Sequence, residues 1–255
     1  MHILVCVKRV PLTGGKIVLT DDQRAISTKH LGFTVSPHEE CGVEEAVQIV
    51  ERLGGSVTVL TLGPAEAEEQ LRDMMAIGAD RAIHLVTDGE EWDPQATASA
   101  IVAAIQADAD SYDLLLFGNE SADAGNYQVA IRVAHALGLP CVTGIKAISI
   151  DSDPAHPRAR CEQEVAGGRD IYDVALPAVV SVKEGINLPR YPSVPGRLRA
   201  KRKPLDTSSP EHAASQLEMV RLVLPPDSGK QVQVLGRGAE AAPAVVEILS
   251  ELGVL

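Results

Sequence analysis

The sequence predicts an α/β fold with a doubly wound, mainly parallel sheet, followed by a C-terminal arm. Over residues 1–145, short apolar runs rich in β-branched residues alternate with longer amphipathic runs of helical period. The strand-like runs are apolar throughout, which is typical of parallel strands covered on both faces. With 255 residues, 45% of them hydrophobic, the chain is long enough to bury one sizeable core.

The predicted elements follow one another regularly up to residue 145. Glycine ends three of the predicted helices, at Gly54, Gly78 and Gly138, and Asp93 caps the start of another before Pro94. Because right-handed crossovers place every strand-to-helix loop at one edge of the sheet, we expect a ligand at that edge. The strands are expected at 3–7, 56–62, 82–86 and 114–118, and the helices at 39–53, 64–77, 93–107 and 126–137.

The pattern changes after about residue 145. Two alternating runs around Gly167 and Gly168 predict a hairpin over 161–176. A buried strand is predicted at 176–182, and the polar run 205–217 is interpreted as a surface arm. The final expectations are strand-like segments at 218–225 and 231–236, and a terminal helix at 241–255.

Composition excludes several classes of protein. The net charge of −12 leaves no global basic field for a nucleic acid, and the 3% of aromatic residues argues against base stacking. No apolar run reaches the ~18 residues that a membrane span needs, so we expect no membrane insertion. The first residues are interpreted as a strand and not as a signal peptide. The cysteines form no C-x-x-C motif and are expected to be reduced in a cytoplasmic protein: Cys6, Cys41, Cys141 and Cys161.

Motifs for independent catalysis are missing from the sequence. It contains no G-x-S-x-G, P-loop, H-E-x-x-H or complete G-x-G-x-x-G, and "GRGAE" at 236–240 is interpreted as a plain turn. His38 is the one histidine of seven on the expected ligand edge. The carboxylates at the start of the first helix suit its dipole without a metal: Glu39, Glu40, Glu44 and Glu45. We therefore expect neither catalytic residues nor a metal site.

The best candidate for binding is the loop after the strand 114–118. Gly118 and Gly125 permit close backbone approach, and polar residues lead into a helix start, where backbone N–H groups favour a phosphate. An ordinary loop with Ser121 or Asp123 as the helix cap explains the pattern equally well.

The densest charge feature is the stretch "NLPRYPSVPGRLRAKRKP" at 187–204. It can be a solvated loop, a docking loop for an acidic partner, or an RNA-binding segment, and the last is weakened by Tyr191 being its single aromatic. Prolines would stiffen a docking loop and lower its ordering cost. The basic residues within 21 positions are Lys183, Arg190, Arg197, Arg199, Lys201, Arg202 and Lys203, against the single acid Glu184.

The segment "LPAVVSVKEGINLPRYPSVPGRLRAKRKP" closely resembles the signature of the electron-transferring flavoprotein beta subunit. Further resemblances follow in the family's order: "ILVCVKRVP", "SPHEECGVEEAVQI", "TLGPAEAEEQLRDMMAIGADRAIHL" and "EQEVAGGRD". The resemblance implies an adenine nucleotide alpha hydrolase-like, Rossmann-type fold, and an electron carrier subunit without turnover of its own.

The resemblance also implies cofactors and partners. An alpha subunit would hold most of the FAD, and the heterodimer would carry electrons from acyl-CoA or N-methyl amine type dehydrogenases to a quinone reductase. The beta pocket would hold AMP or, in the electron-bifurcating branch, a second FAD. We expect AMP, because no site for a reduced nicotinamide is found. A stand-alone adenine-nucleotide-binding protein of universal-stress type and a purely structural subunit are the alternatives of other classes.

Residues of the family's nucleotide pocket can be placed on this sequence. Cys6 and Leu62 would offer backbone groups to the adenine, and the loop 118–129 would hold ribose and phosphate. Ser36 replaces the usual asparagine, and His38 stands where an aromatic residue that touches the FAD ring is often found. The implied pocket comprises Cys6, Ser36, Pro37, His38, Glu39, Leu62, Gly118, Asn119, Glu120, Ser121, Ala122, Asp123, Ala124, Gly125, Asn126, Tyr127, Gln128 and Val129.

The resemblance assigns 187–204 as a partner-recognition loop. Val194 takes the position of the family's exposed leucine, one methylene shorter, which is worth ~0.8 kcal/mol of burial. Glu164 matches an acid that pairs across the alpha-subunit interface. We expect a nucleotide-binding domain at 1–186, this loop, and an arm at 205–255 that packs on the alpha subunit. The other implied docking residues are Arg190, Tyr191, Pro195, Arg197, Arg199 and Lys201.

Overall fold

The computed structural model describes residues 1–12, 14, 17–151, 153, 156–226 and 234–255. Its contacts divide the chain into two compact units. The first comprises residues 1–18 and 26–220, and the second comprises 19–25 and 221–255. Each is described here by itself. The functional boundaries expected at 186 and 204 remain predictions.

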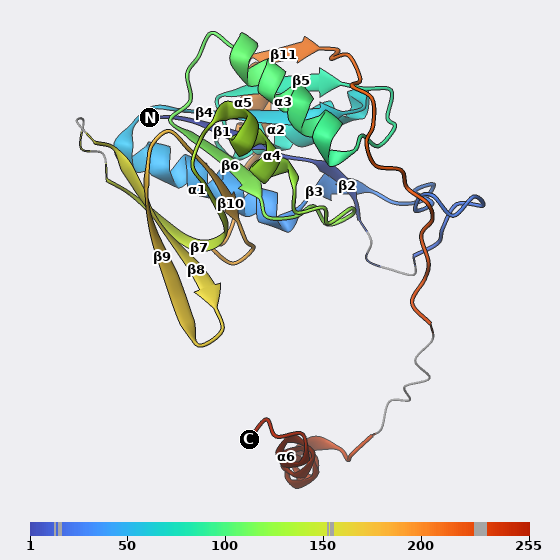
Figure 1. Ribbon diagram of the computed structural model, residues 1–255. Helices are drawn as coiled ribbons and strands as arrows, with labels where there is room; N and C mark the ends of the chain where they lie inside the picture. Colours follow the sequence, from blue (N-terminus) through green and yellow to red (C-terminus); the bar gives the residue numbers. More distant parts are fainter. Residues whose placement is uncertain (13, 15–16, 152, 154–155, 227–233) are drawn as a thin grey trace. The chain divides into compact units, whose positions relative to one another are not determined.

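A nine-stranded sheet runs through the first unit (Figure 1). All of its ladders are parallel except the last two, which join β7 to β8 and β8 to β9. The predicted fold class, a mainly parallel α/β sheet, is confirmed. In spatial order the strands are β11 (Leu205–Ser208), β5 (Arg81–Val86), β4 (Ser56–Gly63), β1 (His2–Cys6), β6 (Leu114–Gly118), β10 (Ala178–Val182), β7 (Cys141–Asp151), β8 (Arg158–Val165) and β9 (Gly168–Ala175).

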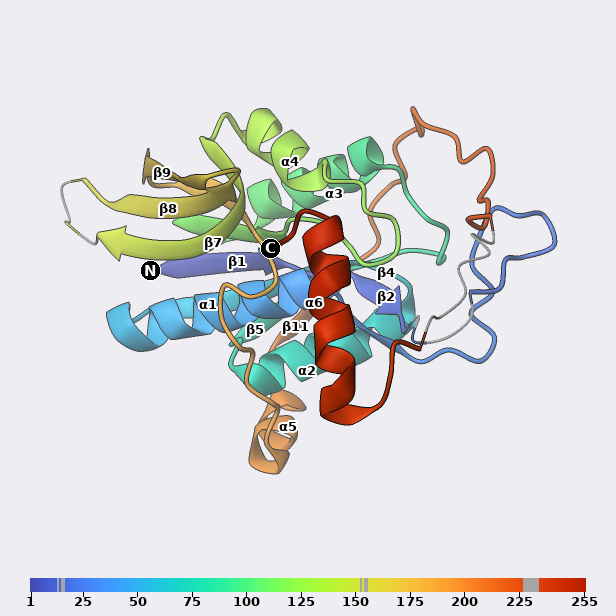
Figure 2. The same cartoon turned by 90° about the horizontal axis from the view of Figure 1, so that it is seen from below.

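Helices cover both faces of the sheet (Figure 2). On one face lie α1 (Pro37–Leu53) and α2 (Glu68–Ile77), the latter preceded by η1 (Ala65–Ala67). On the other face lie α3 (Pro94–Ala107) and α4 (Val129–Leu137). This two-sided cover explains why the strand-like runs are apolar throughout.

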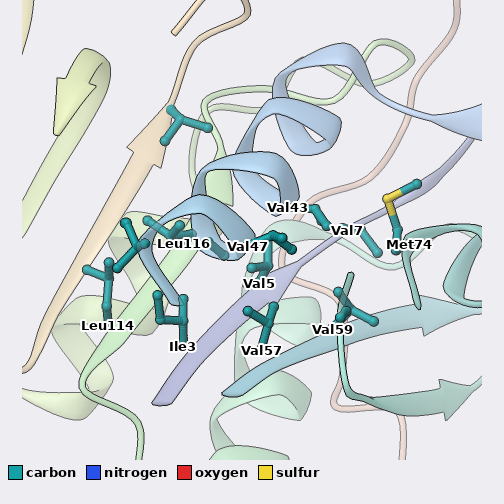
Figure 3. Packing of buried hydrophobic residues seen from close by; sticks show 14 of the residues in the cluster. Ile3, Val5, Val7, Val43, Val47, Val57, Val59, Met74, Leu114 and Leu116 are labelled. Atoms are coloured by element: carbon teal, nitrogen blue, oxygen red, sulfur yellow. The ribbon is translucent and has the colours of Figure 1, made fainter. Parts of the chain in front are cut away.

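Alternate side chains along a strand belong to two separate hydrophobic clusters, one on each face of the sheet. In β1, Ile3 and Val5 belong to the cluster under α1 and α2, whereas Leu4 and Cys6 belong to the cluster under α3 and α4. Figure 3 shows side chains of the first cluster, with strand residues packed against helix residues. The strand residues labelled there include Ile3, Val5, Val57, Val59, Leu114 and Leu116, and the helix residues are Val43, Val47 and Met74.

The three predicted glycine ends and the Asp93 cap are confirmed, whereas α1, α2 and α4 begin at Pro37, Glu68 and Val129 and not at 39, 64 and 126. Asp93 caps α3, because its Oδ1 accepts a hydrogen bond from the N–H of Ala96 at 2.7 Å. Gly138 ends α4 in the left-handed region, with φ at +66°. Gly54 and Gly78 are the C-caps of α1 and α2.

Several segments differ from the sequence expectations. The stretch 187–204 is not a loop throughout, because α5 (Val194–Ala200) begins within it. Ser193 caps this helix by accepting a hydrogen bond from the N–H of Gly196, and Pro195 has the fixed φ that suits a first turn. The predicted surface arm contributes the edge strand β11. Besides β11, three further described strands were not predicted: β7 and the small antiparallel pair β2 (Arg9–Pro11) and β3 (Phe33–Val35).

The hairpin is confirmed, with its turn one residue earlier than expected, since Val165 pairs with Gly168. The strand predicted at 218–225 is wrong, since these residues pair with no described strand. Of the segment 231–236, residues 231–233 lie outside the described residues, and 234–236 form no strand.

The second unit holds the predicted terminal helix, α6 (Ala242–Glu251), preceded by η2 (Gly238–Ala241). The N–H of Leu222 donates to the carbonyl of Gln23 at 2.7 Å, which joins the two segments of this unit. None of the ten α6 residues is buried. Across the described residues, no helix is long and apolar enough to cross a membrane.

Candidate functional site

A cavity lies at the carboxyl edge of the sheet, where the order of the strands reverses. From β1 the chain proceeds to β4 and β5 on one side, and later to β6 and β10 on the other. Open α/β sheets bind their ligands at such a switch point. The cavity has a volume of about 400 Å³ and is lined by Ser36, Pro37, His38, Glu120, Ser121, Ala122, Asp123, Ala124, Gly125 and Glu184. The structure thus brings together two predicted segments that lie more than 80 positions apart.

The first wall of the cavity is the start of α1. Ser36 is the N-cap residue, but its side chain makes no capping hydrogen bond and donates instead to the carbonyl of Glu120 at 3.3 Å. His38 follows in the first turn, with its Nε2 3.8 Å from Oε1 of Glu120. Its Nδ1 is buried and has no hydrogen-bond partner among the described residues. A buried ring nitrogen without a hydrogen-bond partner is expected to find one that the described side chains do not supply, such as a water or a ligand.

The second wall is the segment 119–125. Its start is fixed, because the N–H of Asn119 donates to the carbonyl of Val182 at 2.9 Å and its Oδ1 accepts from the hydroxyl of Ser181 at 3.0 Å. The N–H of Gly125 donates to the carbonyl of Ser121 at 3.1 Å, and Gly125 has a φ of +55°. Neither Ser121 nor Asp123 caps α4, whose N-cap is Gln128, so the predicted helix cap is wrong.

Lys8 stands behind this second wall. Its Nζ lies 2.8 Å from Oδ2 of Asp123 and 2.6 Å from Oε1 of Glu91. Burial alone would raise the pKa of Asp123, but Lys8, together with hydrogen bonds from Ser121 and the N–H of Ala124, holds that pKa below its ordinary value. Burial would likewise lower the pKa of Lys8, but the two carboxylates raise it. Both groups are therefore charged at neutral pH.

Glu39 is buried beside Lys8 and does not line the cavity. Its Oε2 accepts a hydrogen bond from the N–H of Lys8 at 2.5 Å. Burial raises its pKa to about 8, against the opposing effect of that hydrogen bond. A Cβ on Gly118 would lie 2.5 Å from Cγ of Glu39, so only glycine leaves room for this side chain. Burial also raises the pKa of the neighbouring Cys6 thiol, with Glu39 adding to the effect.

The basic segment 187–204 forms ion pairs and hydrogen bonds with the helices beside it. Arg190 pairs with Glu44 and Glu51 of α1, and Arg197 pairs with Asp73 of α2 at 2.6 Å. The amide of Asn187 donates to Oε2 of Glu45 and to the carbonyl of Cys41. These contacts leave four apolar side chains exposed, by the fractions Leu188 90%, Tyr191 95%, Val194 73% and Leu198 61%.

Comparison with known proteins now decides the family. The family model described as electron transfer flavoprotein domain matches residues 25–213. The electron transfer flavoprotein subunit beta of Bacillus subtilis is 34% identical over 259 residues, which cover 98% of this chain and 97% of that protein. The chain belongs to the electron transfer flavoprotein beta-subunit family.

Other members of the electron transfer flavoprotein beta-subunit family match almost as completely. The subunit beta of Syntrophomonas wolfei is 36% identical over 92% of this chain and 90% of its own length. The mitochondrial subunit beta of Arabidopsis thaliana is 31% identical over 92% of this chain and 93% of its own. The resemblance predicted from the sequence motifs is thereby confirmed.

Not all of the pocket residues implied by the beta-subunit resemblance line the cavity. The side chain of Cys6 is buried in the hydrophobic cluster under α3 and α4, and Leu62 packs against that cluster. Their predicted backbone role toward the adenine stays a prediction. Gln128 faces a second cavity of about 380 Å³, where its Oε1 accepts from Arg132 at 2.9 and 3.2 Å. The remaining implied residues outside the first cavity are Glu39, Gly118, Asn119, Asn126, Tyr127 and Val129.

Sequence reasoning missed three residues of this site in the beta-subunit chain. Glu184 lines the cavity from the segment after β10. Ser181 is buried in β10 and links Asn119 to the N–H of Gly144. Lys8 could have been noticed as a charge directly after a buried strand at the ligand edge. Glu164, predicted at the subunit interface, is exposed on β8 opposite Arg169 of β9.

Proposed function

We propose that this chain is the beta subunit of a heterodimeric electron transfer flavoprotein. With an alpha subunit it carries electrons from flavin dehydrogenases of acyl-CoA or N-methyl amine type to a quinone reductase, without a catalytic turnover of its own. The proposal extends the family membership to a route of electrons. The observation that carries it furthest is the cavity at the switch point of the sheet, which is lined by the start of α1 and by the segment after β6.

We infer that the cavity holds an adenine nucleotide, AMP. About 400 Å³ is within the range of small-molecule sites. Carboxylates such as Glu120 and Glu184 accept hydrogen bonds from ribose hydroxyls, while N–H groups at the helix start suit a phosphate. The lining residues therefore fit the ribose of the nucleotide, whereas none of the ten is a lysine or arginine that would neutralise the phosphate. FAD, which supplies the electron-carrying chemistry, would be held mostly by the alpha subunit.

Counting the cofactors tests this assignment. The chain is co-purified with its alpha subunit, the complex is denatured in acid, and released flavin and AMP are measured by absorbance and chromatography. We expect one FAD and one AMP per heterodimer. Two flavins without AMP would overturn the AMP assignment and support the electron-bifurcating alternative, in which a second FAD fills the cavity.

The exposed apolar residues of the basic segment form the proposed docking surface for the dehydrogenase. Val194 starts α5, and Leu188, Tyr191 and Leu198 stand exposed around it. Exposed apolar side chains rimmed by charges are typical of protein interaction sites. Arg199 and Lys201 are exposed too, and a basic rim steers the encounter with an acidic partner. Pro195 and Arg197 stabilise the helix that presents Val194.

A single substitution tests the docking proposal. Val194→Ala removes exposed apolar surface without disturbing a buried contact. We expect slower reduction of the complex by its dehydrogenase, measured by stopped-flow absorbance, with the bound flavin unchanged. Loss of flavin instead would show that Val194 has a structural role. Glu164, on the exposed face of β8, and the arm 205–255 are proposed to contact the alpha subunit.

A further inference from the structure

Lys8 connects three segments around the cavity, although its own side chain does not line it. It lies two residues after the end of β1. Its N–H donates to Oε2 of Glu39 in the first turn of α1. Its Nζ contacts Asp123 in the second wall and Glu91 in the segment that leads to α3.

The two carboxylates around the ammonium group are not equivalent. Side-chain exposure is 19% for Asp123 and 64% for Glu91, and the Lys8 side chain is 27% exposed. An exposed pair is screened by water and is worth little, whereas a mostly buried pair resists screening. The contact with Asp123 is therefore the less screened of the two, although the contact with Glu91 is shorter, at 2.6 Å against 2.8 Å, and its charge contributes more to raising the pKa of Lys8.

Asp123 transmits this contact to the cavity wall. While its Oδ2 faces Lys8, its Oδ1 accepts a hydrogen bond from the N–H of Ala124 at 2.7 Å. Both residues line the cavity, together with their neighbours from Glu120 to Gly125. The position of the ammonium group thus fixes the carboxylate of Asp123, which lies within the segment 120–125. The same positive charge offsets one of the carboxylates that would face a phosphate-bearing ligand.

We propose that Lys8 is the positioning residue of this site: by holding Asp123 it orders the 120–125 wall and thereby sets the affinity for a nucleotide. The ordering of the wall follows from the geometry alone, whereas the effect on affinity rests on the proposed function.

Three variants of the complex with the alpha subunit separate this role from general stabilisation. Lys8→Met removes the charge, Lys8→Arg keeps it, and Glu91→Gln removes only the exposed partner. Amide hydrogen exchange of residues 120–125 reports the order of the wall, with β4 and β6 as internal references. Calorimetric titration with AMP, after dialysis to remove bound nucleotide, reports affinity.

We expect exchange in 120–125 to be at least tenfold faster in Lys8→Met, with β4 and β6 unchanged, and AMP affinity to be at least tenfold weaker. Lys8→Arg should restore both to within about threefold, and Glu91→Gln should change neither by more than about twofold. Unchanged exchange in Lys8→Met, or an equal effect of Glu91→Gln, would overturn the proposal.

A fourth variant covers the case in which Lys8→Met fails to fold. Asp123→Asn keeps the size of the side chain and leaves Lys8 in place, so it should loosen the same six residues, and unchanged exchange there would refute the positioning role. If the wild-type complex binds no AMP, the proposed function fails, whereas the exchange measurements still decide the role of Lys8.

Discussion

Arg190 binds the carboxylate of Glu44 with two parallel hydrogen bonds, Nε to Oε2 at 2.9 Å and Nη2 to Oε1 at 3.0 Å. Glu44 lies on α1 and its side chain is 3% exposed. Such bidentate pairs fix geometry as well as adding energy. A charge counted in the sequence as part of a docking surface is therefore directed inward, and it anchors the segment that carries Val194.

Removing this anchor should destabilise the chain. Arg190→Met leaves the buried carboxylate of Glu44 without its cationic partner, while Gln48 still donates to it at 2.7 Å. Allowing for the partial exposure of Arg190, we expect the free energy of unfolding to fall by about 2 kcal/mol in urea titrations. Arg190→Lys, which cannot form the bidentate pair, should lose about half as much. A change below ~0.5 kcal/mol in Arg190→Met would contradict the anchoring role.

Glu39 should make stability depend on pH. Its pKa is about 8 in the folded chain and 4.5 ordinarily, so between these values the folded state holds a proton that the unfolded state has released. The contribution of this group to stability is complete below pH 4.5 and is lost as the pH rises toward 8. Glu39→Gln cannot titrate. The difference between its melting temperature and that of the wild type should therefore shift in favour of the variant as the pH rises. A constant difference in melting temperature between the two proteins from pH 5 to 8.5 would refute this. Lys8, Asp123 and Cys6 face the same group and are left intact.

Asp93 should hold the chain after β11 as well as the start of α3. Its Oδ2 accepts hydrogen bonds from the N–H groups of Gln216 at 2.5 Å and Leu217 at 3.1 Å, and Trp92 stacks on His212 with ring centroids 4.3 Å apart. Asp93→Ala should cost about 1–2 kcal/mol and change the fluorescence of Trp92, which is the single tryptophan of the chain.

A matched variant isolates the second role of Asp93. Serine also caps helices, but it lacks the second carboxylate oxygen that receives Gln216 and Leu217. Asp93→Ser should keep most of the stability and still show the altered fluorescence. A wild-type spectrum in both variants would argue against the contact.

Gly196 should be required for α5 to pack closely against α2. A Cβ at this position would lie 2.7 Å from the carbonyl oxygen of Ala76. Gly196→Ala should therefore push the helix away and cost about 1–3 kcal/mol, measured by thermal melting. Gly168→Ala is the control, because a Cβ there meets nothing within 4 Å. Equal melting temperatures for the two variants would count against this close approach.

The sequence predicted most of the sheet because burial on both faces leaves a plain pattern of apolar runs. It missed β7, since Gly144 interrupts the alternation where the ladder with β10 is irregular. It missed α5 because seven residues behind two prolines lack helical period, and the helix depends on distant contacts such as Arg72 with the carbonyl of Ala200. The apolar residues of 218–225 suggested a strand, but a strand also needs a hydrogen-bonded neighbour, which no local pattern reveals.

The candidate site was predictable to a similar extent. The start of α1 and the segment after β6 follow from topology, which places such loops at one edge. Lys8 and Asp123 are 115 positions apart, and no pattern within a window of sequence reveals such a pair. Glu184 was counted in the sequence only as the acid among basic residues, and its place in the cavity depends on how the chain leaves β10.

Among the described residues, the outer edge of β9 pairs with no further strand, and its eight residues could accept another copy of themselves. If two such strands aligned antiparallel over their whole length, each Asp170 would stand directly opposite the Asp173 of the other. Like charges in that arrangement repel, so the pairing of two β9 edges is disfavoured. A foreign strand with lysine or arginine at those positions meets no such repulsion. The repulsion is reduced at Asp173, whose charge is partly offset by Arg158 at 2.8 Å, so Asp170 contributes the larger share of this bias against self-pairing.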